Sequence, residues 1–305
     1  MRRTDVAELV TLAMLWGGAF LFMRVGAPQF GPFALIALRV GIASVLLLAL
    51  VAARGRLGEM RRHAPALALL GVVNSAVPFV LFAYAALHVT AGFSAILNST
   101  SPMFTAIVAY AWFGERLGAA RVLGLVVGLA GVVVLAWERV SWTSGAAASA
   151  VGACLVASAF YGVGGNLARR RLAGVDPYTV AAGSQCAASA VLLPFAIAAW
   201  PAASPSPLAW GAVAVLGLAS TGVAFILYFR LIANVGPSKA ITVTFLVPAF
   251  GMLFGALFLG ERVTASMAAG AVIVVAGTAM ATGVLRVPRC ARRASDAVPP
   301  VSPRR

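Results

Sequence analysis

Apolar stretches of about twenty residues, separated by short segments that carry nearly all of the charge, recur along the whole chain. About 20 apolar residues in an α-helix match the hydrocarbon thickness of a bilayer. Only 10% of the residues are charged, against about 25% in soluble proteins, so a fold in water would lack a polar surface. We therefore expect an all-α integral membrane protein with ten transmembrane helices, at residues 6–26, 32–53, 65–87, 91–113, 121–138, 148–168, 177–198, 208–230, 239–259 and 266–285.

The basic residues predict which helix ends face the cytoplasm. Of the 23 Lys and Arg, 19 fall in the N-terminal segment, in alternate loops and in the tail. Loops on the other side contain only Arg139 and Arg262, and Arg24 and Arg39 lie within spans. Because cytoplasmic loops carry an excess of Lys and Arg, this bias predicts a multi-pass protein of the plasma or inner membrane with both termini cytoplasmic. We expect residues 286–305 to form a disordered basic tail.

The second half of the sequence repeats the first at an offset of 146 residues. Pro102 corresponds to Pro248, and the Gly-Glu-Arg triplet at 114–116 corresponds to the same triplet at 260–262. The register holds without a gap from about residue 66 to residue 131, and the first two helices of each half match with a slip of one residue. Chance similarity between apolar segments does not keep a proline and a charged triplet at a fixed spacing.

This duplication predicts two five-helix repeats, at residues 1–138 and 148–285. A unit with an odd number of spans enters its second copy from the opposite side of the membrane, so the two repeats are expected to be inverted. Inverted repeats can adopt two near-equivalent arrangements, each open to one side, around a shared site near the bilayer midplane. The sequence therefore predicts a transporter that works by alternating access.

Several motifs are similar to a known family. The stretches Leu-Trp-Gly-Gly-Ala-Phe at 15–20, Ala-Leu-Arg at 37–39 and Leu-Tyr-Phe-Arg-Leu-Ile at 227–232, with the two Gly-Glu-Arg turns, resemble EamA-type members of the drug/metabolite transporter superfamily. The resemblance covers nearly all of the chain except the tail. It implies a central cavity lined by both halves and export or exchange of amino acids or related metabolites. One departure is Arg230, where many second halves of this family carry tyrosine.

Arg39 is the most informative single residue of the sequence. It lies about two turns into the second predicted helix, where an arginine costs roughly 2.5–3.5 kcal/mol on insertion scales. One interpretation is a cation that binds a substrate carboxylate in the cavity. The other is a structural role, in which Arg39 braces a neighbouring helix or extends to the membrane surface. The sequence leaves both open.

Other polar residues and prolines within the spans are candidates for the substrate site, because a polar group has no reason to face lipid. Prolines inside spans free backbone carbonyls that can line a cavity. Helix packing and interhelical hydrogen bonding are the alternative explanation. These candidates are Trp16, Asn74, Tyr84, Asn98, Ser101, Pro102, Tyr161, Asn166, Gln185, Tyr228, Thr244 and Pro248.

Other functional classes find less support in the sequence. An intramembrane enzyme would need a nucleophile–base pair or a metal cluster, and no such pattern occurs within the spans. We expect no catalytic residues, cofactor, metal or nucleic-acid partner, and we expect a small metabolite and the lipid bilayer as partners. A lipid flippase or a non-transporting assembly partner remains an alternative. Small-residue spacings such as Gly124 and Gly128 fit packing inside a monomer or in a homodimer.

Overall fold

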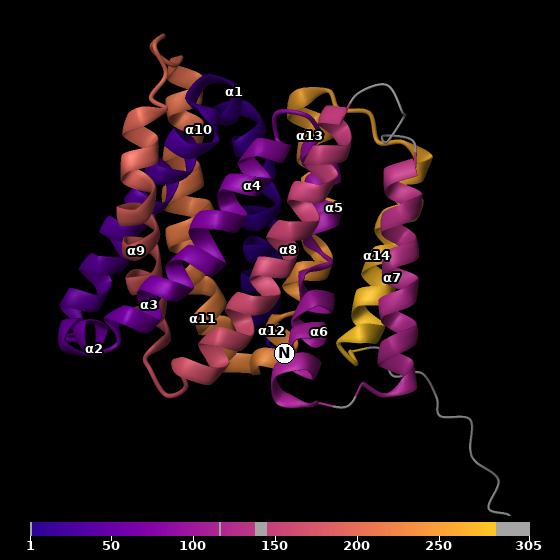
Figure 1. Ribbon diagram of the computed structural model, residues 1–305, viewed down its shortest axis with the longest axis horizontal. Coiled ribbons are helices and arrows are strands. Elements are labelled where there is room, and N and C mark those ends of the chain that lie inside the picture. The colour runs from indigo at the N-terminus through magenta and orange to yellow at the C-terminus, as the bar shows by residue number, and fades with distance from the viewer. Residues whose placement is uncertain (1, 116, 138–144, 285–305) are drawn as a thin grey trace, which may run out of the picture.

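A computed structural model describes residues 2–115, 117–137 and 145–284, and this part of the chain consists of helices and connecting turns (Figure 1). The helices stand roughly upright in one bundle, and successive rods run in alternating directions. In chain order they are α1 (Arg3–Ala53), α2 (Leu57–Arg62), α3 (Ala64–Gly71), η1 (Val72–Ala76), α4 (Val77–Ala85), α5 (Ala91–Asn98), α6 (Ser101–Phe113), α7 (Ala119–Trp137), α8 (Gly145–Arg171), α9 (Pro177–Ala198), α10 (Pro207–Gly217), η2 (Leu218–Val223), α11 (Ala224–Val235), α12 (Pro237–Ala240), α13 (Val243–Leu259) and α14 (Ala265–Ala281).

Six helical segments of the described chain are long and apolar enough to cross a membrane: α1, α3 to α4 through η1, α7, α8, α9, and α10 to α11 through η2. Helices α13 and α14 are apolar but shorter. The longest, α1, contains two rods, because Gly31 has the non-helical dihedral angles φ 71° and ψ 162°. A positive φ of this kind is accessible to glycine at little steric cost. The prolines at 28 and 32 lie on either side of this turn. The turn separates the predicted spans 6–26 and 32–53.

Two of the rods widen into a π-helix at equivalent places in the two halves. The π-helical segment η1 lies between α3 and α4, and η2 lies between α10 and α11, 146 residues later. In η2 the hydroxyl of Thr221 donates to the carbonyl of Leu216, 2.9 Å away and five residues earlier. Such a bond competes with the regular backbone ladder and locally widens a helix. The π-helix is thus a property of the repeated unit.

The last helices of the two halves, α7 and α14, pack side by side at one edge of the bundle (Figure 1). Gly128 lies against Gly277, and Gly131 lies against Val274. Residue numbers therefore rise along one helix as they fall along the other, so these two equivalent helices are antiparallel. A Cβ atom at Gly277 would meet the backbone of Gly128, which explains why glycine occupies this contact.

A second pair of equivalent contacts joins the two halves. Gly17 of α1 lies against Phe250 of α13, and Gly162 of α8 lies against Phe104 of α6. Phe104 and Phe250 are 146 residues apart. The first helix of each half thus packs on the fourth helix of the other half.

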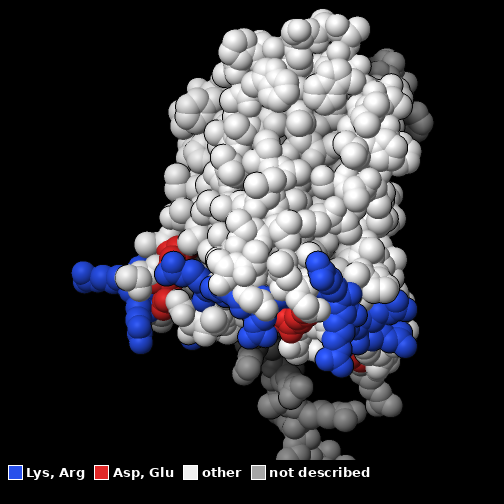
Figure 2. Space-filling model, turned by 90° about the vertical axis from the view of Figure 1, so that its left-hand side faces the viewer, with Lys and Arg blue, Asp and Glu red and all other residues white. Residues whose placement is uncertain are grey.

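The charged side chains gather at one end of the bundle, as Figure 2 shows for one face of the molecule. We call this the basic end; it contains the N-terminal arginines, Arg54 to Arg62 around α2, the C-terminal end of α8 and the α11–α12 turn. Figure 1 places the N-terminus and the end of α14 at this same end. Arg24 lies toward the opposite end, and Arg116, Arg139 and the predicted tail lie outside the described residues.

We predict that Gly277→Val destabilises the protein by separating α7 from α14. Overpacking of this kind typically costs about 1–3 kcal/mol, which for a chain of this size lowers Tm by roughly 2–10 °C. The matched control is Gly152→Val on α8, where an added side chain meets no atom within 4 Å. Thermal unfolding of the detergent-purified variants measures the difference. Equal Tm values for the two variants would contradict the packing described here.

Candidate functional site

Arg39 is buried among four rods of the bundle, with 5% of its surface exposed. Its Nε donates to Thr221 Oγ1 of η2 at 2.9 Å, and Nη1 lies 3.8 Å from Met23 Sδ. The guanidinium carbon is 3.7 Å from the centroid of the Phe79 ring. A cation over an aromatic face gains about 2 kcal/mol when it is desolvated, so this environment offsets part of the burial of the charge.

No carboxylate of the described chain neutralises Arg39. The ion pairs found there join Arg24, Arg56, Arg169 and Arg230 to other acids. The thioether of Met23 is a weak acceptor, so the distal nitrogens of Arg39 lack a strong partner within the described part of the protein. A buried guanidinium of this kind has the geometry to bind a carboxylate from outside the chain.

Gln185 of α9 forms the matching contact on the other half. It is fully buried, and its Nε2 donates to Ser75 Oγ of η1 at 2.8 Å. Its Oε1 has no hydrogen-bond partner among the described residues. An unpaired buried amide oxygen costs about 1–3 kcal/mol, which a donor on a bound ligand would offset.

The acceptors of these two bonds occupy equivalent positions, because Ser75 and Thr221 are 146 residues apart. Each lies in a π-helical segment, and each accepts a bond from the second helix of the other half. With the slip of one residue, Arg39 corresponds to Ser184. Gln185 is the next residue along the chain. We name Arg39, Gln185, Ser75 and Thr221 the central polar cluster.

The two ends of this cluster contact the same rod. Ser75, which binds Gln185, and Phe79, which lies beneath Arg39, are four residues apart on one rod. Side chains at this spacing are neighbours on a helix, with about 5–6 Å between their Cβ atoms. Arg39 and Gln185 thus both contact the rod formed by α3, η1 and α4.

Two further predicted site residues, Tyr161 and Asn74, lie beside the cluster, and two others, Trp16 and Tyr228, contact each other. The Tyr161 ring contacts Phe79 at 6.3 Å and Phe82 at 6.1 Å between centroids. Trp16 contacts Tyr228 in the same way on the other half, at 5.2 Å. Asn74 precedes Ser75 in η1, and its side chain lies against Gly164 of α8. The structure brings Tyr161 and Asn74 to the rod that joins Arg39 and Gln185.

The polar residues near the breaks of the fourth helices have local partners. The hydroxyl of Ser101 donates to the carbonyl of Asn98 at 2.6 Å, between α5 and α6, and Pro102 follows in the first turn of α6. In the second half, the hydroxyl of Thr244 donates to the carbonyl of Ile241 at 2.8 Å, and Pro248 is buried inside α13. These bonds satisfy groups at the helix breaks.

Two predicted site residues make contacts elsewhere. Tyr84 hydrogen-bonds Ser149 at 2.9 Å, and its ring contacts His88 near the opposite end. Asn166 is buried, and its Nδ2 donates to the carbonyls of Thr105 and Gly162 at 3.0 and 2.9 Å. Asn166 thus links α8 to α6, as expected from the structural interpretation of intramembrane amides.

The sequence interpretation did not single out Ser75, Thr221, Phe79 or Met23 as site residues. The repeat contains the signal for two of them, because hydroxyl residues recur at 75 and 221 at the fixed offset. Phe79 recurs as Phe225 at the same offset, but apolar residues fill most positions of these helices, so neither Phe79 nor Met23 stands out as a site residue.

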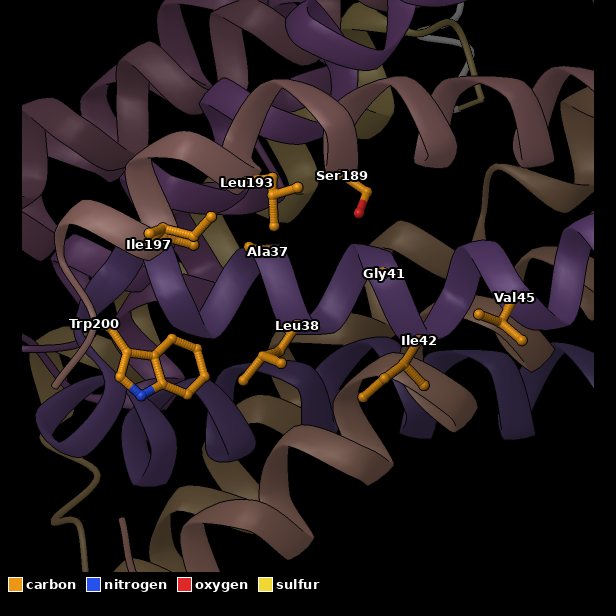
Figure 3. A pocket seen from close by; sticks show the side chains of 10 residues that line it. Ala37, Leu38, Gly41, Ile42, Val45, Ser189, Leu193, Ile197 and Trp200 are labelled. Carbon is orange, nitrogen blue, oxygen red and sulfur yellow. The ribbon is translucent and has the colours of Figure 1, made fainter. Parts of the chain in front are cut away.

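A pocket of about 330 Å³ lies apart from the cluster, between the second half of α1 and α9 (Figure 3). Its lining is apolar except for Ser189 and the indole nitrogen of Trp200, and it includes the exposed Val45 and Ile197. Neither Arg39 nor Gln185 lines it. This pocket is a groove toward hydrocarbon and offers a polar solute few partners.

Comparison with known proteins identifies the family of the chain. Both halves match the EamA-like transporter family, over residues 7–137 and 148–283. The chain belongs to this family. The family consists of transporters and not of enzymes, so this EamA-like protein is a multi-pass membrane protein. The resemblance seen in the sequence motifs is confirmed.

Individual relatives are distant but cover most of the chain. The uncharacterized transporter YoaV of Bacillus subtilis is 24% identical over 277 residues, which are 90% of this chain and 95% of YoaV. A probable terminal-alkyne amino-acid exporter of Streptantibioticus cattleyicolor is 28% identical over 278 residues, which are 89% of this chain and 91% of the exporter. A protein of known crystal structure shares the fold, with a TM-score of 0.68 and 24% identity over 94% of this chain and 99% of that one.

We predict that Thr221→Val lowers the stability of this EamA-like protein by about 1–3 kcal/mol, because it leaves the buried Arg39 Nε without its acceptor. The matched control is Thr282→Val, whose hydroxyl bonds only to carbonyls of its own helix, Thr278 and Ala279. Chemical or thermal unfolding in detergent compares the two. A loss in the control equal to that in Thr221→Val would show that Arg39 does not depend on this bond.

Proposed function

We propose that this protein is a secondary transporter that exports amino acids or related small metabolites by alternating access, with Arg39 as the group that binds the substrate carboxylate. The observation that carries the proposal is the buried guanidinium of Arg39 without a carboxylate partner in the described chain. Gln185 supplies an acceptor for a substrate N–H or O–H at the other end of the central polar cluster.

The repeat supports the transport mechanism. We propose two inverted five-helix repeats, at residues 1–138 and 148–285, which give ten transmembrane helices. The antiparallel packing of α7 on α14 and the exchanged contacts of Gly17 and Gly162 favour this arrangement. An inverted pair can exchange the conformations of its two halves, which moves the opening from one face to the other.

The chemistry of the cluster supports the substrate class. Arginine binds carboxylates through paired N–H donors, and low polarity around the pair strengthens the interaction. The described part of the site holds no second cation, which fits a single carboxylate better than a phosphate dianion. The relative described as an amino-acid exporter agrees with this class and leaves the side chain of the substrate open.

We propose that the basic end faces the cytoplasm. The concentration of Lys and Arg at that end supports this orientation, with both termini inside. The substrate then reaches Arg39 from the cytoplasm and leaves at the opposite end.

The alternative of a lipid flippase needs a polar path for a headgroup beside an apolar path for acyl chains. The groove between α1 and α9 is apolar apart from Ser189 and the indole nitrogen of Trp200, and neither Arg39 nor Gln185 lines it. The cluster therefore favours a small polar solute over a lipid.

We predict that Arg39→Gln abolishes amino-acid exchange with little effect on folding. Glutamine already donates to the equivalent hydroxyl, Ser75, from the neighbouring position 185, so the variant can keep the bond to Thr221 while it loses the charge. Counterflow of a radiolabelled mixture of L-amino acids in proteoliposomes is expected to fall at least about tenfold, the loss of roughly 1.4 kcal/mol or more of carboxylate binding. Arg61→Gln, which removes an exposed charge at the basic end, is the control. Unchanged exchange in Arg39→Gln would exclude the carboxylate contact.

We predict that reporter fusions place the end of α14 in the cytoplasm and the α9–α10 connection on the other side of the membrane. Phosphatase fused after residue 284 is expected to be inactive, and the same enzyme inserted at residue 203, in the α9–α10 connection, is expected to be active. A phosphatase signal from the first fusion and none from the second would reverse the proposed orientation.

A further inference from the structure

Two ion pairs occupy equivalent places at the two ends of the bundle. At the opposite end, Arg24 Nε lies 3.9 Å from Glu261 Oε1, and at the basic end Arg169 Nη2 lies 2.6 Å from Glu115 Oε1. Glu115 and Glu261 are 146 residues apart, and Arg24 and Arg169 are 145 apart, the slip that the first helices show. Each pair joins the first helix of one half to the turn after the fourth helix of the other half.

The pair at the opposite end also bonds to a third segment, the α4–α5 turn. Both carboxylate oxygens of Glu261 lie 3.0 Å from the backbone nitrogen of Ala91, the first residue of α5. Arg24 Nη1 donates to the carbonyl of Ala86 at the end of α4, at 2.5 Å. The Glu261 side chain is only 10% exposed. Together these groups close the α4–α5 turn onto α1 and the α13–α14 turn.

The pair at the basic end has a shorter distance but more contact with water. The side chains of Arg169 and Glu115 are 53% and 40% exposed. Exposed ion pairs contribute little, because water and salt screen them, so we judge the strength of the two pairs by burial and by additional bonds. By both measures the pair at the opposite end is the stronger one.

The sequence contains the reason for this asymmetry. The position equivalent to Ala91 in the second half is Pro237, 146 residues later. Proline has no backbone N–H, so Glu115 cannot form at Pro237 the bond that Glu261 forms at Ala91. The difference is a single backbone donor, which is present at one end of the bundle and absent at the other.

We propose that Glu261, Arg24 and the amide of Ala91 form a latch that holds the opposite end shut, and that Pro237 keeps the equivalent latch at the basic end weak. The transporter therefore opens first toward the basic end. For an exporter with its basic end in the cytoplasm, this resting preference presents the site to the substrate that is to be removed. The inference rests on the proposed alternating access.

The decisive variants remove the backbone N–H at one end of the bundle or introduce it at the other. Ala91→Pro removes the N–H at the first residue of α5, a position that accepts proline, since Thr90 before it is extended with ψ 158°. Pro237→Ala restores the donor in the second half. Ala265→Pro is the matched control, because it places proline after the extended N-cap Thr264 of α14, where the described chain offers the N–H no acceptor. Glu261→Gln tests the latch without any change of the backbone.

Two equivalent distances between spin labels are measured by pulsed electron paramagnetic resonance in detergent or nanodiscs. The labels are attached to the full chain, with its native cysteines replaced by alanine. Labels at residues 88 and 263 report the opposite end, and labels at residues 234 and 117, 146 residues away in the repeat, report the basic end. In the unaltered sequence we expect one narrow distance at the opposite end and a broad or double distribution at the basic end.

Ala91→Pro and Glu261→Gln are expected to raise the population of long distances at the opposite end at least threefold, and Pro237→Ala to lower it at the basic end by a similar factor. Ala265→Pro should leave both distributions unchanged. Equal distributions in Ala91→Pro, Glu261→Gln and the unaltered protein would overturn the latch, as would an effect of Ala265→Pro as large as that of Ala91→Pro. These results do not depend on the substrate, so the amino-acid exchange assay of Arg39→Gln judges the proposed function separately.

Discussion

Hydrocarbon offers no hydrogen-bond partner, and this constraint governs the whole bundle. A polar group in the middle of a span must find its partner inside the protein. Here the partners come from the other half of the chain: Arg39 donates to Thr221, and Gln185 donates to Ser75. Each half would therefore leave buried polar groups unsatisfied without the other, and the site exists only where the two halves meet.

The same constraint explains where the helices are irregular. A π-helix or a helix break exposes carbonyls and hydroxyls, and it is tolerated in a membrane only where protein covers it. The segments η1 and η2 contain Ser75 and Thr221 and receive the bonds from the other half. Single π-helical turns inside α-helices occur frequently at functional sites, and here both contribute an acceptor to the central polar cluster.

The apolar spacing predicted the positions of the helical rods well, since length and hydrophobicity alone decide whether a segment fits the bilayer. The interruptions were predicted less well. Pro102 indicated a break near α6, but no proline marks η2, where the hydroxyl of Thr221 takes the carbonyl of Leu216. For the site, Arg39 and Gln185 could be named because polar residues are rare within spans. Their relation could not, because it depends on which face of each helix meets the other half.

The two halves share a helix pattern but differ in sequence at most positions, and two of these differences bear on the proposed preference for one opening. Perfectly symmetric repeats would open equally to both faces and would bind a substrate equally well in two orientations. Arg39 and Gln185 make the two substrate orientations unequal, since only one end of the central polar cluster carries a charge. Ala91 and Pro237 make the two ends of the bundle unequal, because one end has a backbone N–H that the other lacks. On the proposed mechanism, a duplicated unit can thus favour one opening and one substrate orientation through changes at a few residues, with no change of fold.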